Sequence, residues 1–415
     1  MKVLLIGGGG REHALGWKLA ASPRVNELIS LPGNPGLARV GSVVEGIEPT
    51  TVGAVAAAAA ALRADLVVVG PEQPLAAGLV DALTARRIPV WGPTRAAAML
   101  ESSKSFAKNV MDRAGVATAS WASFDEVDAA LKHLRTVSGR FVVKADGLAG
   151  GKGVLVTEDA GSAAAWVNRC FAGAFGPAGK TVVIEEFLEG PELSVFGLCA
   201  GESVLSLAPA RDYKRLLTGD QGPNTGGMGS YSPVGDLPAR LADRTVDQVI
   251  LPVLRTMAGD GRPYTGFLYV GLVLTEAGPQ VLEFNARLGD PETQVILPRL
   301  QTDLVDLIEA GLEGDLASAP AQWSSNSAVN VVLAAHGYPE DPRSGDAVTI
   351  GKIDPSTLLF HAGTRQQGSH VVTSGGRVLN VVGIEADHAA ARDAAYAAVE
   401  RISFPGMHYR LDIGS

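Results

Sequence analysis

The chain has 415 residues, a formal net charge of −9 and two cysteines. This length suggests two to four domains, and the negative charge without any Lys/Arg-rich block disfavours a nucleic-acid binder. Two cysteines exclude a disulfide framework and a cysteine-based zinc site, although they could still pair with each other. The first apolar run is too short for a signal peptide and no stretch is long and apolar enough to cross a membrane, so we expect a cytoplasmic protein.

The first hundred residues alternate strand-like and helix-like segments. Apolar strands are predicted at 3–6, 27–30, 66–69 and 88–91, with helices at 12–21, 52–64 and 75–86. Repeated β-α-β units with continuous apolar strands predict a parallel sheet that is covered on both faces. We therefore expect an α/β, Rossmann-like N-terminal domain over residues 1–100.

An α+β domain is expected over residues 101–320, with a small lid subdomain at about 116–190. Its helices are predicted at 94–115, 160–171 and 246–257, and its strands at 141–144, 154–156, 181–185, in two paired strands within 193–208, and in a hairpin of 266–274 with 280–285. Between these strands, residues 212–233 are interpreted as a long and sparsely structured loop. Such a loop inside a compact enzyme is usually functional or disordered.

A small β-rich C-terminal domain is expected over residues 321–415. It begins with a strand at 328–335 and ends with a helix at 388–402. Between them the sequence predicts Gly/Pro-rich turns and a hairpin with residues 374–376 at its tip.

Glycine is overrepresented, with 50 of 415 residues against a usual share of about 7%, and three clusters lie beside apolar strands. Residues 7–10 follow a strand and begin a helix, which makes an anion site, but Glu12 and His13 stand where a dinucleotide fingerprint needs glycine. Residues 146–153 are not a Walker A loop, because Asp146 and Gly153 stand where Gly and Ser/Thr are needed, and they indicate a hairpin loop whose amides could close over phosphates. Residues 222–229 suggest close approach of the backbone to a polar ligand. The alternatives are a tight turn without ligand, an exposed hairpin tip and a disordered loop.

Charged residues accompany these loops. Lys144 ends a strand just before the second loop, where its ammonium group could reach a phosphate or simply extend to water. Lys104 lies at the start of a helix, where it could equally be a surface charge. The acidic segment 185–192 indicates either a solvated turn or a hinge that contacts a nucleotide.

Glu283 and Asn285 lie on the same side of a predicted strand, and Arg287 continues that side. Two oxygen ligands at this spacing suit Mg²⁺, which also binds phosphate oxygens and water. This set of polar side chains next to an apolar strand is costly unless the residues are used.

Together these segments resemble the glycinamide ribonucleotide synthetase family of the ATP-grasp superfamily. The resemblance is carried by GGGGREHAL (7–15), GPEQPL (70–75), KADGLAGGKGV (144–154), EEFLEGPELS (185–194), RDYKR (211–215), GDQGPNTGGMGSYSP (219–233) and LEFNARLGDPETQ (282–294). The sequence departs from the family's usual pattern at Leu288, Gly150 and Arg211. No metal-binding carboxylate stands on the strand at 271–274 either, so metal binding is expected to depend on Glu283 and Asn285.

The resemblance implies a role for each matching residue. It implies that Mg²⁺ or Mn²⁺ is held by Glu283 and Asn285, and that Lys144, Arg287 and Asp212 act in catalysis. The residues implied to bind ATP are Lys104, Lys144, Gly147, Gly150, Gly151, Lys152, Gly153, Glu185, Glu186, Leu188 and Glu192. The residues implied to bind the other substrates are Gly9, Gly10, Pro71, Glu72, Asp212, Lys214, Asn224, Thr225, Gly226, Arg287, Gly289 and Asp290.

The family's reaction is the ATP-dependent joining of glycine to 5-phosphoribosylamine through glycyl phosphate, in purine biosynthesis. The resemblance therefore implies small-molecule substrates, no nucleic acid and no membrane. We expect a monomer that contacts the enzyme supplying phosphoribosylamine only transiently. The alternatives are another carboxylate–amine ligase of the same fold and a non-catalytic nucleotide-sensing module, which would be expected to lose a lysine or the metal pair.

Overall fold

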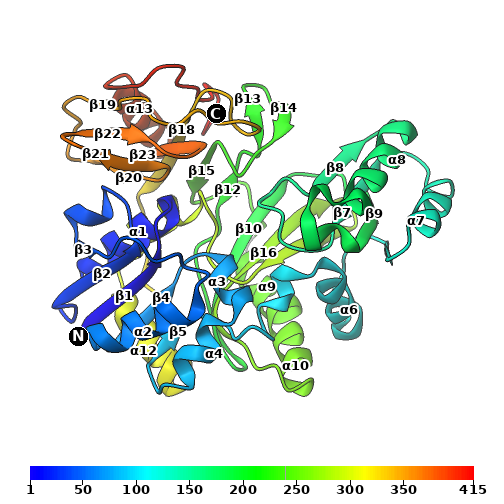
Figure 1. The fold of residues 1–415 in the computed structure, drawn as a ribbon, viewed down its shortest axis with the longest axis horizontal. Coiled ribbons are helices and arrows are strands. Elements are labelled where there is room, and N and C mark those ends of the chain that lie inside the picture. The colour runs from blue at the N-terminus through cyan, green and yellow to red at the C-terminus, as the bar shows by residue number, and fades with distance from the viewer. Residues whose placement is uncertain (239) are drawn as a thin grey trace.

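The computed structural model describes residues 1–238 and 240–415, and its N-terminal part is a sheet of five parallel strands in the order β3-β2-β1-β4-β5 (Figure 1). The strands are β1 Lys2–Gly7, β2 Glu27–Pro32, β3 Ser42–Val43, β4 Leu66–Val69 and β5 Val90–Trp91, and the helices are α1 Gly10–Ala20, α2 Val52–Leu62, α3 Glu72–Ala77 and α4 Leu79–Thr84. The predicted Rossmann-like sheet is confirmed. The single helix expected at 75–86 is wrong in one detail, because Gly78 adopts a φ of +90° and separates α3 from α4.

The middle of the chain forms an antiparallel sheet in the order β11-β10-β16-β17. Its elements and their neighbours are β10 Glu192–Ala200, β11 Ser203–Ser206, β16 Thr265–Thr275, β17 Gly278–Asn285, α5 Met99–Ser102, α6 Lys104–Ala114, α9 Leu241–Thr245, α10 Leu251–Gly259, α11 Thr293–Ile296 and α12 Leu304–Glu313. A π-helical segment, Val246–Ile250, joins α9 to α10. The predicted hairpin is confirmed, and its register places Gly271 opposite Glu283.

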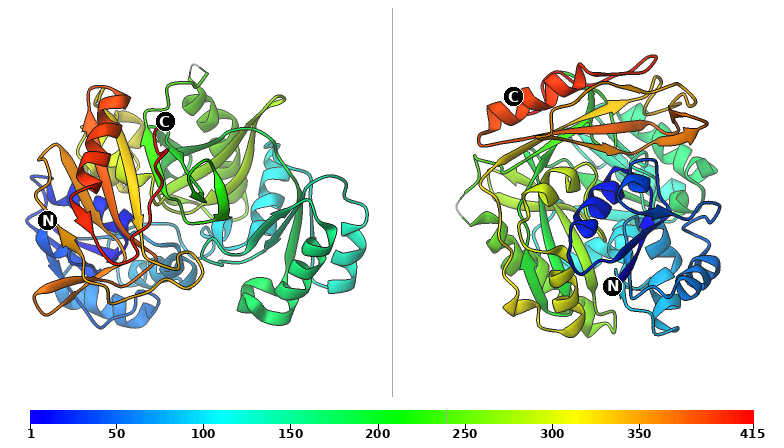
Figure 2. Two further views of the ribbon diagram at one scale, coloured as in Figure 1. Left: turned by 90° about the horizontal axis from the view of Figure 1, so that it is seen from above. Right: turned by 90° about the vertical axis from the view of Figure 1, so that its left-hand side faces the viewer.

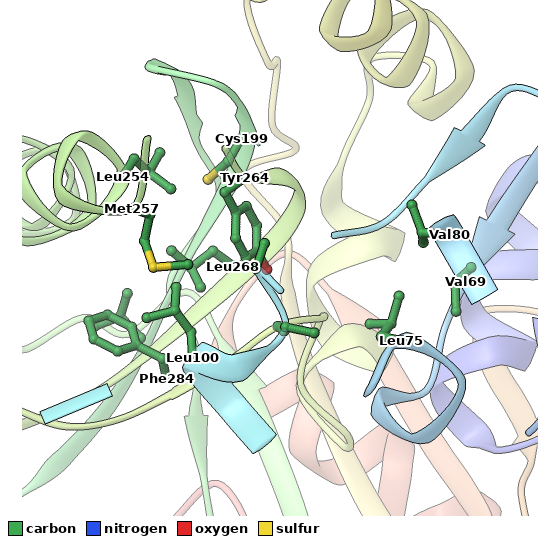
Figure 3. Close-up of a cluster of buried hydrophobic side chains, with 14 of the residues drawn as sticks. Val69, Leu75, Val80, Leu100, Cys199, Leu254, Met257, Tyr264, Leu268 and Phe284 are labelled. Atoms are coloured by element: carbon green, nitrogen blue, oxygen red, sulfur yellow. The ribbon is translucent and has the colours of Figure 1, made fainter. Parts of the chain in front are cut away.

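One hydrophobic core joins the N-terminal sheet to the middle sheet. Figure 3 shows Val69, Leu75 and Val80 on the N-terminal side, facing Leu254 and Phe284 across the shared cluster. Because both units bury apolar side chains in the same cluster, their relative position is fixed by packing. The carboxyl ends of β1 and β4 are therefore held at a constant place beside β17.

The lid subdomain has a hydrophobic core of its own. Its sheet has the order β6-β9-β7-β8, with β6 Trp121–Phe124, β7 Phe141–Ala145, β8 Val154–Thr157, β9 Val182–Glu186, α7 Val127–Leu134 and α8 Ala160–Arg169. Val143, Val167 and Ile184 belong to a cluster separate from the others. Figure 2 shows this unit standing out at one side of the molecule. A unit with its own core can change its orientation without disrupting the rest.

The C-terminal unit is a sheet in the order β12-β15-β18-β23-β20, on which α13 packs. Its elements are β12 Arg211–Asp212, β15 Gly229–Ser232, β18 Ser327–Ala334, β19 Thr349–Ile350, β20 Thr357–His361, β21 Thr364–Gln367, β22 His370–Thr373, β23 Arg377–Glu385, β24 Ile402–Ser403 and α13 His388–Val399. In Figure 1 its strands β20 to β23 and α13 lie over the N-terminal sheet, in orange and red, whereas β12 and β15 are green.

Two predictions for this region are wrong. The segment 212–233 is not sparsely structured, because it holds part of β12, β13 Arg215–Leu217, β14 Gln221–Asn224 and β15. Residues 374–376 do not form a hairpin tip, because β22 pairs with β21 whereas β23 pairs with β18 and β20. Since β23 is buried between two strands of its own sheet, it has no edge to offer to β22.

Within the described residues, no helix has the length and apolar character required to span a bilayer.

Candidate active site

A cavity of about 500 Å³ lies between the lid, the end of β17 and the carboxyl edge of the N-terminal sheet, which is within the usual size range for ligand sites. Most predicted site residues line it: Glu72, Lys104, Lys144, Gly147, Gly150, Gly151, Gly153, Glu185, Glu186, Leu188, Glu192, Asp212, Lys214, Asn224, Thr225, Gly226, Glu283, Asn285, Arg287, Gly289 and Asp290. An adjoining cavity of about 320 Å³ is lined by Gly9, Gly10 and Lys152. Pro71 lines neither of these two cavities.

Two lysines bind a buried glutamate at the base of the lid. Lys144 Nζ on β7 lies 2.9 Å from Glu185 Oε1, and Lys108 Nζ on α6 lies 3.0 Å from Oε2. The side chain of Glu185 is 1% exposed. Burial alone would raise the pKa of the Glu185 carboxyl, but the two ammonium groups outweigh burial and hold the pKa below its ordinary value. The carboxylate therefore orients Lys144 toward the cavity rather than extending to a ligand itself.

Lys104 faces the same cavity from the start of α6. Its Nζ donates hydrogen bonds to the carbonyl oxygens of Asp146 (3.3 Å) and Gly147 (3.1 Å). Burial lowers the pKa of Lys104. Because its ammonium group is hydrogen-bonded to the start of the glycine loop, Lys104 is not a simple surface charge. These hydrogen bonds link the loop to α6.

Lys214 lies between two carboxylates on the opposite wall. Its Nζ pairs with Glu192 and, at 3.1 Å, with Asp212 Oδ1. Burial would lower the pKa of Lys214, but the Asp212 and Glu192 carboxylates outweigh burial and raise it well above its ordinary value. Burial also raises the pKa of the Asp212 carboxyl. The wall thus holds one permanent positive charge and a carboxyl group suited to accepting a proton.

Arg287 connects the end of β17 to the N-terminal sheet. Its Nη2 lies 2.7 Å from Glu101 Oε1 and its Nε lies 3.4 Å from Glu72 Oε2, which is also 3.8 Å from Arg11 Nη2. Burial would raise the pKa of Glu72, but Arg287 and Arg11 lower it to about 2. Burial raises the pKa of Glu101 to about 7 despite Arg287.

The position of Glu72 follows from the sheet topology. In an open parallel sheet, ligands bind at the carboxyl edge where the strand order reverses, here between β1 and β4. Residues 7–10 follow β1 and Glu72 follows β4, so both predicted segments lie at that edge.

Hydrogen bonds and an ion pair fix the turn that follows Arg287. Glu292 accepts a hydrogen bond from Ser194 Oγ at 2.8 Å, and burial raises its pKa to about 7. Asp290 accepts a hydrogen bond from Gln294 Nε2 at 2.7 Å and pairs with Arg377 Nη2 at 3.0 Å. A C-terminal residue thus reaches the turn that was predicted to bind substrate.

Glu283 and Asn285, the predicted metal ligands, lie at the end of β17 and line the larger cavity. Among residues 1–238 and 240–415, Glu283 forms no ion pair, and no group of three or more His, Cys, Asp or Glu side chains could hold a metal by itself. Two oxygen donors are too few to hold Mg²⁺ alone, but they fit a Mg²⁺ ion that completes its coordination with phosphate oxygens and water.

Sequence reasoning missed several residues of this site. These are Arg11, Glu101, Lys108, Glu292 and Arg377. The spacing of Lys104 and Lys108, one helical turn apart, could have revealed Lys108, since residues four apart share a helix face. His13 lies outside the larger cavity, and its Nδ1 accepts the backbone N–H of His361 at 2.7 Å.

Comparisons with known proteins agree with this geometry. Family models match residues 1–101 as the N domain of phosphoribosylglycinamide synthetase, residues 102–293 as its ATP-grasp (A) domain and residues 328–415 as its C domain. The chain belongs to this family. The predicted resemblance and the three-part architecture with an ATP-grasp fold are therefore confirmed.

Relatives of this family match over the full chain. Proteins named phosphoribosylamine–glycine ligase from Rhizobium meliloti (strain 1021) and Streptomyces coelicolor (strain ATCC BAA-471 / A3(2) / M145) are 46% and 49% identical, with 100% of this chain and 98% and 99% of theirs covered. A crystal structure of the Thermotoga maritima phosphoribosylamine–glycine ligase is 35% identical, with a TM-score of 0.87 and full coverage of both chains. A Hydrogenobacter thermophilus biotin carboxylase domain, 16% identical with a TM-score of 0.76, covers 98% of this chain and 91% of its own and shares the fold.

Proposed function

We propose that this protein is a phosphoribosylamine–glycine ligase, which uses ATP to join glycine to 5-phosphoribosylamine in purine biosynthesis. The observation that carries the proposal is the arrangement of the larger cavity. It places Lys144 and the glycine loop on one side, Glu283 and Asn285 at the end of β17, and Arg287 beside them. Relatives that are 46–49% identical over the full chain carry this name.

In the first step, the carboxylate of glycine attacks the γ-phosphorus of ATP, and the bond to the β-phosphate oxygen breaks to release ADP. Lys104 and Lys144 stabilise the charge on the transferring phosphoryl group, while Arg287 orients the carboxylate of glycine. Mg²⁺ or Mn²⁺, held by Glu283 and Asn285, would neutralise further charge on the phosphates. The product is glycyl phosphate.

In the second step, the amine of phosphoribosylamine attacks the carbonyl carbon of glycyl phosphate, and the bond to the phosphate oxygen breaks. The amine loses a proton, for which we propose the carboxylate of Asp212 as the acceptor, because burial raises its pKa. No nucleophile from the protein is needed. Closure of the loop 147–153 excludes water, which would hydrolyse the acyl phosphate.

We also propose the finer features that the sequence predicts. The adenine and ribose lie against Glu186, Leu188 and Glu192, and the domains divide at about residues 100 and 320. The protein acts as a cytoplasmic monomer that receives phosphoribosylamine through a transient contact with the enzyme that makes it.

An isotope-transfer experiment tests this function. Glycine labelled with ¹⁸O in its carboxylate is incubated with ATP, Mg²⁺ and phosphoribosylamine formed in place from ribose 5-phosphate and ammonia. We expect ADP release that depends on glycine, with one ¹⁸O atom in each inorganic phosphate. ADP release without glycine, or phosphate without the label, would contradict the proposal. ATP binding with no turnover would favour a nucleotide-sensing module.

A further inference from the structure

The C-terminal unit sends one arginine into the substrate side of the site. Arg377 begins β23, and its Nη1 donates hydrogen bonds to the carbonyl oxygens of Gly226 and, at 2.6 Å, of Asp290. Its Nη2 pairs with the Asp290 carboxylate at 3.0 Å. Because a guanidinium group offers its donors in a fixed plane, Arg377 fixes the distance between the segments that carry Gly226 and Asp290. It also pairs its positive charge with the Asp290 carboxylate.

A tyrosine of the same unit binds the backbone N–H of Gly226. Tyr338 Oη accepts the Gly226 N–H at 2.9 Å. Both backbone polar groups of Gly226 are therefore bound by C-terminal side chains. The fit is tight, because a Cβ at Gly226 would lie 3.1 Å from Arg377 Cζ.

These contacts line the smaller cavity, and Arg377, Gly226 and Asp290 also line the larger one. The smaller cavity of about 320 Å³ is lined by Arg377, Tyr338, Gly226 and Asp290, with Gly10 at the start of α1 facing them. Lys104 and Lys144 line the larger cavity and not this one. Burial would raise the pKa of Asp290, but Arg377 and Arg11 hold it below its ordinary value, so an oriented carboxylate faces the space.

We propose that Arg377 and Tyr338 are positioning residues through which the C-terminal unit shapes the binding site of the acceptor amine, by fixing the Gly226 backbone and the Asp290 carboxylate. The acceptor is a sugar phosphate that carries an amine, so the inference rests on the proposed function. The hydroxyls and the amine of such a molecule are donors that match a fixed carboxylate. Because Lys104 and Lys144 line only the larger cavity, we expect the binding of ATP to depend little on either residue.

Steady-state kinetics of Arg377→Met, Arg377→Lys and Tyr338→Phe test this role, with ATP and phosphoribosylamine varied in separate series. We expect Arg377→Met to raise the KM for phosphoribosylamine about tenfold or more, since misplacement by about 1 Å can cost a rate factor of about 10². The KM for ATP should stay within about twofold. Arg377→Lys should give an intermediate KM, because a lysine can reach only part of the same partners.

Tyr396→Phe is the matched control. Tyr396 Oη also accepts a backbone N–H, that of Ile413 at 3.0 Å, but it lies outside both cavities. We expect this variant to leave both KM values unchanged. If Arg377→Met does not fold, Tyr338→Phe decides the question, because it removes a single hydroxyl group.

Three results would overturn the inference: an unchanged KM for phosphoribosylamine in Arg377→Met and Tyr338→Phe, an equal rise in both KM values, or the same effect in Tyr396→Phe. Failure of the proposed function is recognisable separately, since the unaltered protein would then show no glycine-dependent release of ADP.

Discussion

Replacing Lys144 with methionine tests whether its ammonium group serves catalysis or only holds Glu185. Methionine keeps an unbranched apolar side chain but deletes the charge that lies 2.9 Å from Glu185 Oε1. Lys108 remains 3.0 Å from Oε2, so the buried carboxylate keeps one cation. The substitution therefore removes the proposed phosphate contact without leaving a completely unpaired charge.

The two expected effects have different sizes. A hydrogen bond to a charged group contributes about 1.5–3 kcal/mol to stability, and this is the expected loss in unfolding free energy. For catalysis, a unit charge about 4 Å from a developing charge contributes roughly 4 kcal/mol at an effective dielectric constant of about 20. Single electrostatic contacts in active sites are worth a factor of about 10²–10³. We therefore expect kcat to fall by about 10²–10³.

Lys108→Met is the matched control for Lys144→Met. Lys108 binds the same carboxylate, but its Nζ also donates to Thr118 Oγ1 at 2.7 Å, which directs it away from a ligand. Glycine-dependent ADP release and thermal unfolding should show similar destabilisation in both variants and a decrease in kcat of less than about tenfold for Lys108→Met. Near-normal ADP release by Lys144→Met would refute the reasoning. Equal losses of kcat would show that both lysines act only through Glu185.

Three further predictions concern the metal, the buried acid and the lid. Glu283→Ala should raise the Mg²⁺ concentration needed for half-maximal rate, whereas substitution of the exposed Glu276 at the tip of the same hairpin should not; equal Mg²⁺ titrations would contradict this. The pKa of Glu101 is raised from 4.5 to about 7, so its contribution to stability is present below pH 4.5 and is lost as the pH rises to about 7. Glu101→Gln should therefore flatten this part of the pH profile of the unfolding free energy, measured with urea. An unchanged profile would refute the assignment. Gly151 and Gly139 have φ values of +75° and +83° with open space around a Cβ, so alanine should cost each about 1–2 kcal/mol of local strain, but only Gly151→Ala should lower kcat/KM for ATP.

The N-terminal sheet was predictable because its sequence pattern is local. Val3, Leu4, Leu5 and Ile6 are all fully buried, and a strand that is covered on both faces is encoded as an uninterrupted apolar run. In contrast, β15 pairs with β18, about a hundred residues further along the chain. No local pattern records such a pairing, so the segment 212–233 was interpreted as a loop.

The candidate site likewise contains residues that a local pattern predicts and residues that only long-range contacts bring together. Glu283 and Asn285 were predictable as a pair, since strand alternation alone places them on one side. Arg377 was not, because its contacts with Asp290 form only when two distant parts of the chain come together. Glu185 is an intermediate case. Glu185 is buried and Glu186 is exposed at the end of β9, and alternation could have separated the carboxylate that orients Lys144 from the exposed one that lines the cavity.

The buried pair of Lys108 and Glu185 also limits how the lid can move. Glu185 belongs to the lid sheet, whereas α6, which carries Lys108, buries Val110 and Met111 in the core shared with the N-terminal sheet. Separating the pair would leave the buried Lys108 ammonium group without a carboxylate, although Glu185 would keep Lys144, at a cost of up to about 3–5 kcal/mol. Lid closure therefore has to turn about this contact rather than pull β9 away from α6. The glycine loop 147–153 lies beyond that pivot, so it can close over the phosphates while Lys144 stays in place beside Glu185.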